Sequence, residues 1–545
     1  MALFHLIAGW IGSVLMCLLA LILIVFLSFC LYIKYIHFKY DHIPGPPRDS
    51  FIFGHSAILR EISNGRVIHD KFLEWSRTYG PVYRINGMHI VMLFVTCPDT
   101  TKEVLMSPKY PKDSLVYKGL FNLFGQRFLG SGLITAHNHD AWYKQRRIMD
   151  PAFSSLYLRG QMGAFNERAE RLMDKLADMA DTNTAANMHQ MFNLVTLDII
   201  TKVAFGVDLD LLKESDTPFP KAIEMCLKGM VHYVRDSTFQ LYPKNKKFIN
   251  EVKESVQLLR STGRRWINER KMAIQNGEDV PKDILTQILK TAGKEENKDN
   301  EDEELMLDNF VTLFVAGQET TANQLAFAVM ELGRLPEILA NAKQEVDDVI
   351  GVKQEISFDD LGKMTYLSQV LKETLRLYPT APGTSRFIPN DITINGIPIP
   401  AGVTCFFNSY VCGRLDKFFE EPLKFDPERF HPDTAKPYYC YYPFALGPRS
   451  CLGQSFAQVR HTHTHTHTHT HTHTHTHTHT HTHTLTPDSF CCFQMEAKVV
   501  MAKLLQRFDF SLLPGQSFDI LDTGTLRPKS GVVCSIRHRG QTAAA

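Results

Sequence analysis

The segment FALGPRSCLGQSFA, from Phe444 to Ala457, places Cys451 in a short turn that is rich in glycine. A thiolate in such a turn can bind a heme iron and donate electron density to it, which favours cleavage of the O–O bond. The thiolate needs a constrained loop, backbone N–H groups directed at the sulfur and a nearby cation, because these lower its basicity and fix its geometry. A buried inert cysteine would explain Cys451 alone, but not the residues spaced around it.

The neighbours of Cys451 each have a role in a loop of this kind. Gly447 and Gly453 allow a tight turn and the close approach of a flat macrocycle. Arg449 can pair with a heme propionate, and Phe444 can shield the sulfur from water. The spaced positions together indicate a heme-thiolate site.

The pattern F-x-x-G-x-R-x-C-x-G resembles the heme-binding signature of the cytochrome P450 family. The resemblance covers the chain from its apolar N-terminal segment to its end, except for one low-complexity tract. It implies a mainly α fold with a minor β part, a bound heme b, and Cys451 as the axial ligand of the heme iron. The composition fits one large globular domain, since 44% of the 545 residues are hydrophobic and 21% are charged.

The stretch AGQETT begins at Ala316, in the middle of a long apolar segment that predicts a helix. Glu319 and Thr320 resemble the acid–alcohol pair of the family, which supplies protons to bound dioxygen without flooding the site. Ala316 and Gly317 resemble the small residues that leave room above the heme. A threonine in mid-helix is by itself more often hydrogen-bonded to the carbonyl four residues earlier, but the cysteine loop favours the catalytic interpretation.

The stretch AWYKQRR matches a W-x-x-x-R pattern, and in the family these two side chains, here Trp142 and Arg146, bind a heme propionate. Arg386, in TSRF, resembles a second propionate-binding arginine. Lys144 and Arg147 lie on the same predicted helix and are candidates for docking NADPH–cytochrome P450 reductase, which supplies electrons in the family. A solvated run of surface charge explains these two residues equally well.

Glu373 and Arg376, in KETLRLYP, share one face of a predicted helix. An isolated pair of this kind is usually an exposed ion pair that contributes little to stability. In the family the pair joins the arginine of a downstream P-E-R-F element, here Arg429, in a buried network. The implied role is folding and heme retention rather than catalysis.

Net charge and cysteine spacing argue against two broad classes of protein. The net charge of +1 gives no electrostatic case for nucleic-acid binding. The eleven cysteines show no CxxC pair and no dense framework, which indicates a reducing compartment rather than a disulfide scaffold.

The first residues of the chain, 1–33, predict a single-pass membrane anchor. The run Leu6–Ile33 is almost entirely apolar, and at about 1.5 Å per residue in a helix it exceeds the roughly 30 Å hydrocarbon core of a bilayer. A cleaved signal peptide has a shorter apolar core, and a buried helix of a soluble domain rarely runs so long without a polar residue. The sequence therefore favours an anchor over both alternatives.

The basic residues that follow the anchor set its expected orientation. Lys34, Lys39 and Arg48 lie after the apolar run and nothing basic precedes it, so the positive-inside rule places the rest of the chain in the cytosol. The expected location is the endoplasmic reticulum membrane. Residues 34–50, with the stretch HIPGPPRDS, predict a stiff proline-rich linker, and 51–545 the heme domain.

Longer stretches narrow the substrate class by resemblance. YDHIPGPPRDSFIFGH, DNFVTLFVAGQETTANQLAFAVMEL, YLSQVLKETLRLYP and MEAKVVMAKLLQRF resemble a sterol-oxidising subfamily, the vertebrate cholesterol 24-hydroxylases. The implied reaction inserts one oxygen atom into the sterol side chain, using O2 and electrons from NADPH. By analogy with the substrate-recognition regions of the family, the candidate pocket residues are Phe121, Ile134, Ala316, Thr320, Ala381 and Thr525.

Three other functions stay open at this point. One is a monooxygenase of fatty acids or other lipids. Another is a heme-thiolate isomerase or dehydratase, which needs no external electrons; such enzymes commonly lack the acid–alcohol pair, so Glu319 and Thr320 argue against it. The third is a non-catalytic heme binder, which would tolerate loss of Thr320 but would keep Cys451.

Twelve His-Thr dipeptides, His461–Thr484, interrupt the segment after the cysteine loop. A metal-binding strand and a low-complexity loop are two interpretations. The third is a retained intron, because deletion of 459–494 joins Gln458 to Met495 and restores the apolar spacing of an amphipathic helix. His-Thr repeats are encoded by (CA)n DNA, the two residues before the tract can be read as a splice donor, and SFCCFQ as an acceptor. We favour the retained intron.

Local patterns also predict several elements of secondary structure. The alternating residues of Val82–Val95 predict short strands, and the charged run Gly293–Leu305 predicts a loop. The apolar segment Leu305–Leu335 predicts a long helix that Pro336 ends.

Overall fold

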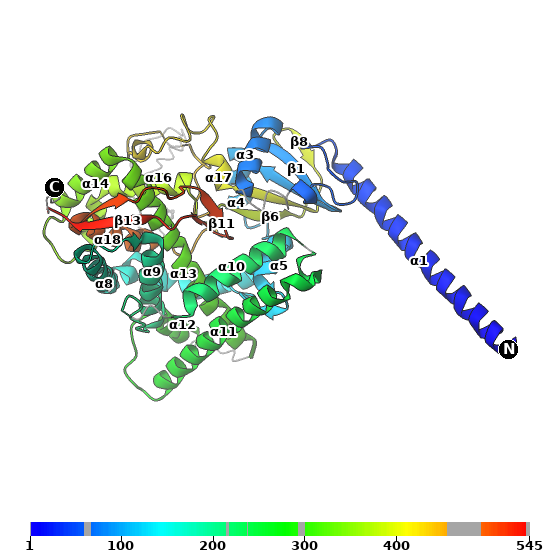
Figure 1. Cartoon of the computed structure of the whole chain (residues 1–545), viewed down its shortest axis with the longest axis horizontal. Coiled ribbons are helices and arrows are strands. Elements are labelled where there is room, and N and C mark those ends of the chain that lie inside the picture. The colour runs from blue at the N-terminus through cyan, green and yellow to red at the C-terminus, as the bar shows by residue number, and fades with distance from the viewer. Residues whose placement is uncertain are drawn as a thin grey trace, which may run out of the picture.

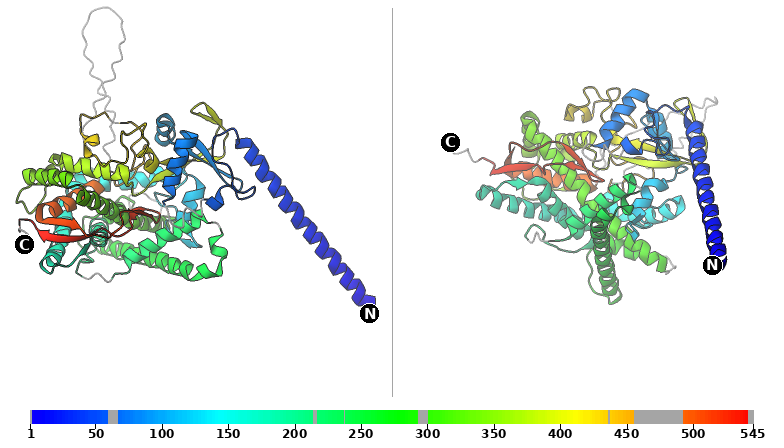
Figure 2. Two further views of the ribbon diagram at one scale, coloured as in Figure 1. Left: turned by 45° about the horizontal axis from the view of Figure 1, so that its top comes forward. Right: turned by 45° about the vertical axis from the view of Figure 1, so that its right-hand side comes forward.

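The computed structural model describes residues 2–58, 67–213, 217–236, 238–292, 300–435, 437–454 and 492–540. These form a large helical body with a smaller β-rich part on one side, and helix α1 (Ala2–Tyr40) projects away from the body (Figures 1 and 2). The mainly α fold with a minor β part is therefore confirmed. The His-Thr tract lies outside the described residues.

The body is built mostly from long helices. They are α8 (Met162–Asp181), α9 (Met188–Phe205), α10 (Phe219–Arg235), α11 (Lys246–Gln275), α13 (Asn300–Arg334), α14 (Pro336–Val349), α16 (Thr365–Leu377) and α18 (Cys492–Arg507). The shorter helices are α3 (Ile68–Tyr79), α4 (Pro98–Met106), α5 (Ser114–Phe121), α6 (His139–Met149), α7 (Ser155–Arg159), α12 (Ile284–Ala292), α15 (Phe358–Lys363) and α17 (Ser409–Cys412), with 3-10 turns η1 (Asp150–Phe153), η2 (Phe239–Leu241), η3 (Pro243–Asn245) and η4 (Pro427–Phe430).

The strands form small sheets rather than one layer. The largest has the order β1-β2-β9-β6, in which β2 runs parallel to β9 and the other pairs are antiparallel. A second sheet has the order β10-β13-β5, and the described residues also form three two-stranded sheets, β3-β4, β7-β8 and β11-β12. The strands are β1 (Val82–Gly87), β2 (Ile90–Val95), β3 (Asn122–Leu123), β4 (Gln126–Arg127), β5 (Ala186–Asn187), β6 (Gly383–Ile388), β7 (Ile392–Ile394), β8 (Ile397–Ile399), β9 (Val403–Asn408), β10 (Phe508–Leu512), β11 (Ile520–Asp522), β12 (Leu526–Pro528) and β13 (Val533–His538).

Helix α13 runs through the centre of the body and packs along α9 (Figure 1). It is buried on most sides because its sequence is apolar around much of its circumference. Phe314, Leu325 and Phe327 are fully buried in the main hydrophobic core. The residues that face other elements from α13 are therefore held by a rigid scaffold.

Three predictions from local sequence patterns can be compared with these elements. Strands β1 and β2 confirm the expectation for Val82–Val95. The long helix ends at Arg334 as predicted, but Pro336 also begins α14, since proline fits the first turn of a helix. The predicted charged loop Gly293–Leu305 was wrong at its end, because α13 already begins at Asn300.

Helix α1 does not stop at the end of the apolar run. The only helix in the described part of the chain that is long and apolar enough to cross a membrane is Ile7–Tyr40. Its last turns pack on the β-rich part, where the His37 imidazole hydrogen-bonds to the carbonyl oxygen of Met88 and the Tyr40 hydroxyl to that of Ala401. The start of the expected 34–50 linker is therefore helical and docked.

Candidate heme-binding and catalytic site

The cysteine loop is closed by its own backbone. The N–H of Cys451 donates to the carbonyl oxygen of Phe444 over 2.9 Å, and that of Ser450 to Gly447 over 3.0 Å. Gly447 has a φ of +71°, and a Cβ atom there would lie 2.2 Å from the carbonyl oxygen of Leu105. Only glycine fits this position, because it tolerates both the left-handed backbone and the contact.

The sulfur of Cys451 is partly buried and surrounded by donors. Burial raises the pKa of the thiol, whereas N–H groups of Gly453 and Gln454 and the nearby cations Arg146 and Lys112 act to lower it. These are the contacts that stabilise a thiolate.

Helix α6 carries Trp142 and Arg146 on its buried face. The Arg146 guanidinium donates to the carbonyl oxygen of Ser450 over 2.8 Å and to Asp150 over 2.5 Å, so it ties α6 to the cysteine loop. The Arg449 guanidinium lies over the Trp142 ring, 4.4 Å from its centre. Arg449 also donates to the carbonyl oxygen of Ala136 over 2.7 Å.

Two further buried cations lie near the loop. Arg386, on β6, is 1% exposed, and burial lowers its pKa. Its Nη1 donates to Thr384 and Ser385, but its Nη2 has no hydrogen-bond partner among the described residues. Lys112 is also buried, donates to the carbonyl oxygen of Ile134 over 2.6 Å, and has a pKa well below its usual value because of burial and the charges of Arg386 and Arg449.

This cluster fits a heme bound through Cys451. Buried cations that repel one another, with a guanidinium nitrogen left without a partner, are costly unless an anion joins them. The two propionates of heme b are anions of the right kind. Lys112 was not identified from the sequence, because it lies in no motif and only the fold brings it beside Arg386.

Helix α13 presents the acid–alcohol pair in two different environments. The Thr320 hydroxyl donates to the carbonyl oxygen of Ala316 over 2.8 Å, and both residues are partly exposed although most of the helix is buried. Glu319 is 5% exposed and burial raises its pKa. Gly317 packs on α9, where a Cβ atom would lie 2.6 Å from Cγ1 of Ile200.

The other pocket candidates come from separate segments. Phe121 ends α5 and is partly exposed, as is Ile134 in the loop before α6; Ala381 is exposed just before β6. Thr525 is buried in the turn between β11 and β12, and its hydroxyl donates to Glu319 over 2.6 Å. The contact between Thr525 and Glu319 could not have been read from the sequence.

Glu373, Arg376 and Arg429 meet in the interior. The Arg376 guanidinium forms two hydrogen bonds of 2.7 Å to the Glu373 carboxylate, and both side chains are fully buried. Arg429 Nε, from η4, lies 3.5 Å from Glu373 Oε1. Arg376 also donates to the carbonyl oxygens of Gly413 and Pro422, so it ties α16 to the loops that precede the cysteine segment.

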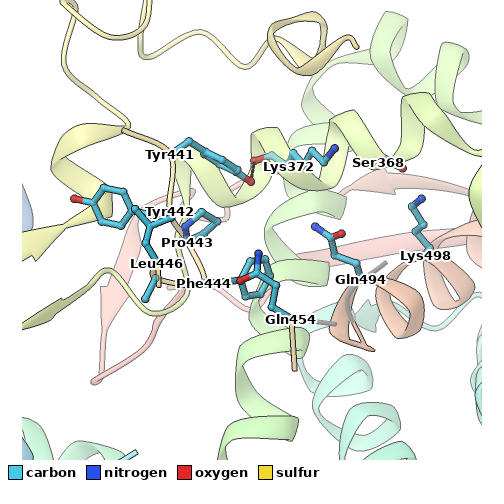
Figure 3. Close-up of a pocket in the computed structure, with 11 residues that line it drawn as sticks. Ser368, Lys372, Tyr441, Tyr442, Pro443, Phe444, Leu446, Gln454, Gln494 and Lys498 are labelled. Carbon is cyan, nitrogen blue, oxygen red and sulfur yellow. Dashed lines mark hydrogen bonds between the residues drawn. The ribbon is translucent and has the colours of Figure 1, made fainter. Parts of the chain in front are cut away.

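One side of the cysteine loop borders a pocket of about 260 Å³ (Figure 3). Residues from three distant parts of the chain line the pocket: Ser368, Lys372, Tyr441, Tyr442, Pro443, Phe444, Ala445, Leu446, Gln454, Gln494 and Lys498.

Helix α6 exposes Lys144 and Arg147 on the face opposite Trp142 and Arg146.

Comparison with known proteins gives one consistent answer. The family model described as Cytochrome P450 matches residues 44–468. Cytochrome P450 4d2 of Drosophila melanogaster is 28% identical over 440 residues, which cover 76% of this chain and 85% of that protein. Cytochrome P450 3A7 of Homo sapiens is 29% identical over 435 residues, 77% of this chain and 83% of that protein. Cytochrome P450 4F12 of Homo sapiens is 27% identical over 435 residues, with 76% and 81% covered.

Proposed function

The chain belongs to the cytochrome P450 family, and we propose that this monooxygenase hydroxylates a sterol side chain, converting cholesterol to 24-hydroxycholesterol. The observation that carries hydroxylation is the presence of Glu319 and Thr320 side by side on the central helix of a chain with a heme-thiolate loop. Isomerases and dehydratases have no need of such a pair, because they take no protons from the protein to reduce dioxygen.

Heme b bound here supplies the redox chemistry that activates dioxygen for insertion into a C–H bond. Cys451 would hold the heme iron through its sulfur. Trp142, Arg146, Arg386 and Arg449 would hold the propionates. Lys112 adds a further buried amino group near them, whose charged form an anion would stabilise. Gly447, Gly453 and Phe444 would shape and shield the loop.

Glu319 and Thr320 would supply the protons that the reduction of dioxygen requires. The Thr320 hydroxyl is partly exposed and carries a proton that it now donates to a backbone carbonyl. Burial raises the pKa of Glu319, so its carboxyl holds a proton more readily than an exposed glutamate does and can pass it on as an acid. The surrounding apolar core limits the entry of bulk water.

The sterol assignment rests on resemblance of the four long sequence stretches to the cholesterol 24-hydroxylases. Among the pocket candidates, Phe121, Ile134, Ala316 and Thr320 are partly exposed and Ala381 is exposed, so none of these five is fully enclosed by the protein. Thr525 contributes differently, because its hydroxyl is directed at Glu319.

Electrons would come from NADPH through NADPH–cytochrome P450 reductase at the endoplasmic reticulum membrane. Helix α1 would hold the enzyme there, with the catalytic domain in the cytosol. Lys144 and Arg147 are exposed on α6, whose opposite face contacts the cysteine loop, so they lie where an acidic partner could approach. Glu373, Arg376 and Arg429 would maintain the fold that retains the heme.

The assay that tests the proposal supplies the purified chain with reductase, NADPH and either cholesterol or a long-chain fatty acid. We expect 24-hydroxycholesterol, and much less product from Thr320→Ala. A fatty-acid product alone would overturn the sterol assignment. Conversion of a lipid peroxide without NADPH would indicate an isomerase or dehydratase, and a normal ferrous–CO spectrum without any product would indicate a heme binder.

We also infer that residues 459–494 derive from a retained intron rather than from the functional protein. Sequencing of transcripts across Gln458–Met495 tests this inference. An abundant transcript that encodes the His-Thr tract would contradict it.

A further inference from the structure

The carboxyl group of Glu319 is held by a residue from a distant part of the chain. Thr525 lies in the turn between β11 and β12, and its hydroxyl donates to Oε1 of Glu319 over 2.6 Å. Both side chains are buried, with 5% of Glu319 and 8% of Thr525 exposed. The hydroxyl of Thr320 is engaged elsewhere, with the carbonyl oxygen of Ala316. The acid is thus directed at Thr525 rather than at its neighbouring alcohol.

Thr525 is itself one member of a chain of hydrogen bonds. The side-chain amide of Asn323, one turn along α13 from Glu319, donates to the Thr525 hydroxyl over 3.2 Å. The Asn323 carbonyl oxygen lies 2.7 Å from Nε2 of His189, at the start of α9. Burial lowers the pKa of His189 to about 4, so it is neutral, and Nε2 must carry its proton to donate here. Every donor in the chain then points toward Glu319.

The charged groups around Glu319 divide into two sets. Arg527, on β12, favours the ionised carboxylate, whereas Glu224, on α10, disfavours it. These two form an ion pair of 2.7 Å, so their effects on Glu319 largely oppose each other. Burial favours the protonated carboxyl, and the hydrogen bond from Thr525 opposes this effect more than any other single group does, with a smaller contribution from Asn323.

We propose that Thr525 is a positioning residue that fixes the orientation and proton affinity of Glu319, with Asn323 and His189 behind it. This inference rests on the proposed role of Glu319 as the acid that supplies protons. A hydrogen bond from a hydroxyl stabilises the ionised form, so Thr525 keeps Glu319 able to release a proton that burial alone would retain. The turn between β11 and β12 thereby acts on the proton supply without touching dioxygen.

A purely structural role for Thr525 makes a different prediction. Valine has nearly the same shape as threonine, so Thr525→Val would preserve packing while it removes the hydroxyl. Serine would keep the hydroxyl and lose only a methyl group. If Thr525 only fills space, the valine variant should be closer to the wild type than the serine variant. If its hydroxyl holds Glu319, the serine variant should be closer.

The test is infrared spectroscopy of the full-length ferric protein without substrate, as a function of pH. The carbonyl stretch of protonated Glu319 is identified as the band that Glu319→Gln removes. Loss of one hydrogen bond to a carboxylate is expected to raise the midpoint of its titration by about one to two pH units in Thr525→Val. Thr525→Ser is expected to stay within about half of that shift.

Thr321→Val is the matched control. Thr321 is a buried neighbour of Glu319 on α13, and its hydroxyl has no hydrogen-bond partner among the described residues. The same substitution there should leave the Glu319 band and midpoint unchanged. An unchanged midpoint in Thr525→Val, or an equal shift in Thr321→Val, would overturn the proposal. Circular dichroism on each variant establishes that it has folded.

This readout is independent of turnover. If the chain proves not to oxidise sterols, the product assay fails while the shift of the Glu319 band persists. If Thr525 does not hold Glu319, the band stays in place while the wild-type enzyme still forms product. The two failures are therefore distinguishable.

Discussion

Cys451 is the cysteine toward which two backbone N–H groups and two basic side chains are directed, and this distinguishes it from buried cysteines such as Cys226 and Cys405. For Cys226 and Cys405, burial raises the pKa of the thiol and no N–H group or cation opposes it. For Cys451, two backbone N–H groups and the charges of Arg146 and Lys112 act in the opposite direction. A thiol becomes a metal ligand only as the thiolate, so these contacts support the proposal that Cys451 binds the iron.

Substitution of Cys451 therefore has a specific expected effect. We expect Cys451→Ser to lose the ferrous–CO absorbance characteristic of thiolate-bound heme, because a serine hydroxyl does not ionise under the same contacts. Cys440→Ser is the control: Cys440 is also buried, and it lies outside the loop. A spectrum of Cys451→Ser like that of the wild type would show that another residue binds the iron.

A second residue-scale prediction concerns His189 and pH. Its pKa is about 4 in the folded chain because of burial, below the usual 6.5, so the unfolded chain binds more protons between these values. Stability due to neutral His189 is therefore present above about pH 6.5 and is lost as the pH falls toward 4. Between pH 7 and pH 5 we expect a loss of about 1 to 2 kcal/mol.

Urea unfolding at several pH values measures this loss. His189→Gln should remove that part of the pH dependence, whereas His42→Gln should not, because His42 is exposed. Identical slopes for the wild type and His189→Gln would contradict the assignment.

Candidate site residues could be named from the sequence where they belong to a local motif, and not where only the fold creates the contact. Cys451 and Gly447 belong to one short motif, so the sequence alone identified them. Lys112 and Thr525 belong to no motif. Lys112 lies near Arg386, and Thr525 is hydrogen-bonded to Glu319. The two members of each pair come from different elements, so only tertiary packing brings them together.

At the scale of elements, α16 carries a buried ion pair, Glu373 with Arg376, that also contacts the segment at η4. The Glu373 carboxylate accepts from Arg376 and from the backbone N–H of Asp426. The Arg376 guanidinium also donates hydrogen bonds to backbone carbonyl oxygens, including that of Lys424. A buried pair of this kind costs desolvation, but removal of one partner leaves the other charge buried and unpaired.

We therefore expect Glu373→Ala to destabilise the fold by about 3 to 5 kcal/mol and to reduce the fraction of protein that holds heme. The matched control is Glu269→Ala on α11, which removes an exposed ion pair with Arg265, 64% and 60% exposed, at 3.9 Å. That change should cost less than about 0.5 kcal/mol. Equal effects in thermal melts of the two variants would contradict a special role for Glu373.

Elements with strong periodicity were predicted well, and their ends less well. The strands β1 and β2 and the body of α13 follow from their apolar patterns. The start of α13 at Asn300 could not be predicted in this way, because charged residues are typical both of loops and of exposed helix ends. The extension of α1 to Tyr40 depends on its docking against Met88 and Ala401, which a local pattern does not contain.

At the scale of the molecule, the segments on either side of the His-Thr tract end in the same place. Gln454, before it, and Gln494, after it, line one pocket beside the cysteine loop (Figure 3). Helix α18 then continues into the core, where Met495 and Val500 are fully buried, and packs against α8, α13 and α14. The helix begins at Cys492, so it already includes the last residues assigned to the insert.

Deletion of 459–494 should therefore leave α18 in its present position. Gln458 would take the place of Gln494, which is the same residue type, and the helix would continue back toward Cys451. In the full-length sequence, Pro487 would interrupt a helix, and threonine has a low helix propensity. Each added backbone hydrogen bond contributes about 1 kcal/mol, so we expect a stability gain of a few kcal/mol and fuller heme retention.

Replacement of 459–494 by a Gly-Ser segment of equal length distinguishes interruption of the helix from a function of the histidines. If the interruption matters, that variant should retain as little heme as the full chain, and only the deletion should improve the ferrous–CO spectrum. A requirement for the histidines would appear as lower heme content in both variants than in the full chain. Zinc or nickel titration then tests for metal binding, because the full chain alone would bind these ions tightly. That combination of results would contradict the retained intron and restore the tract as part of the protein.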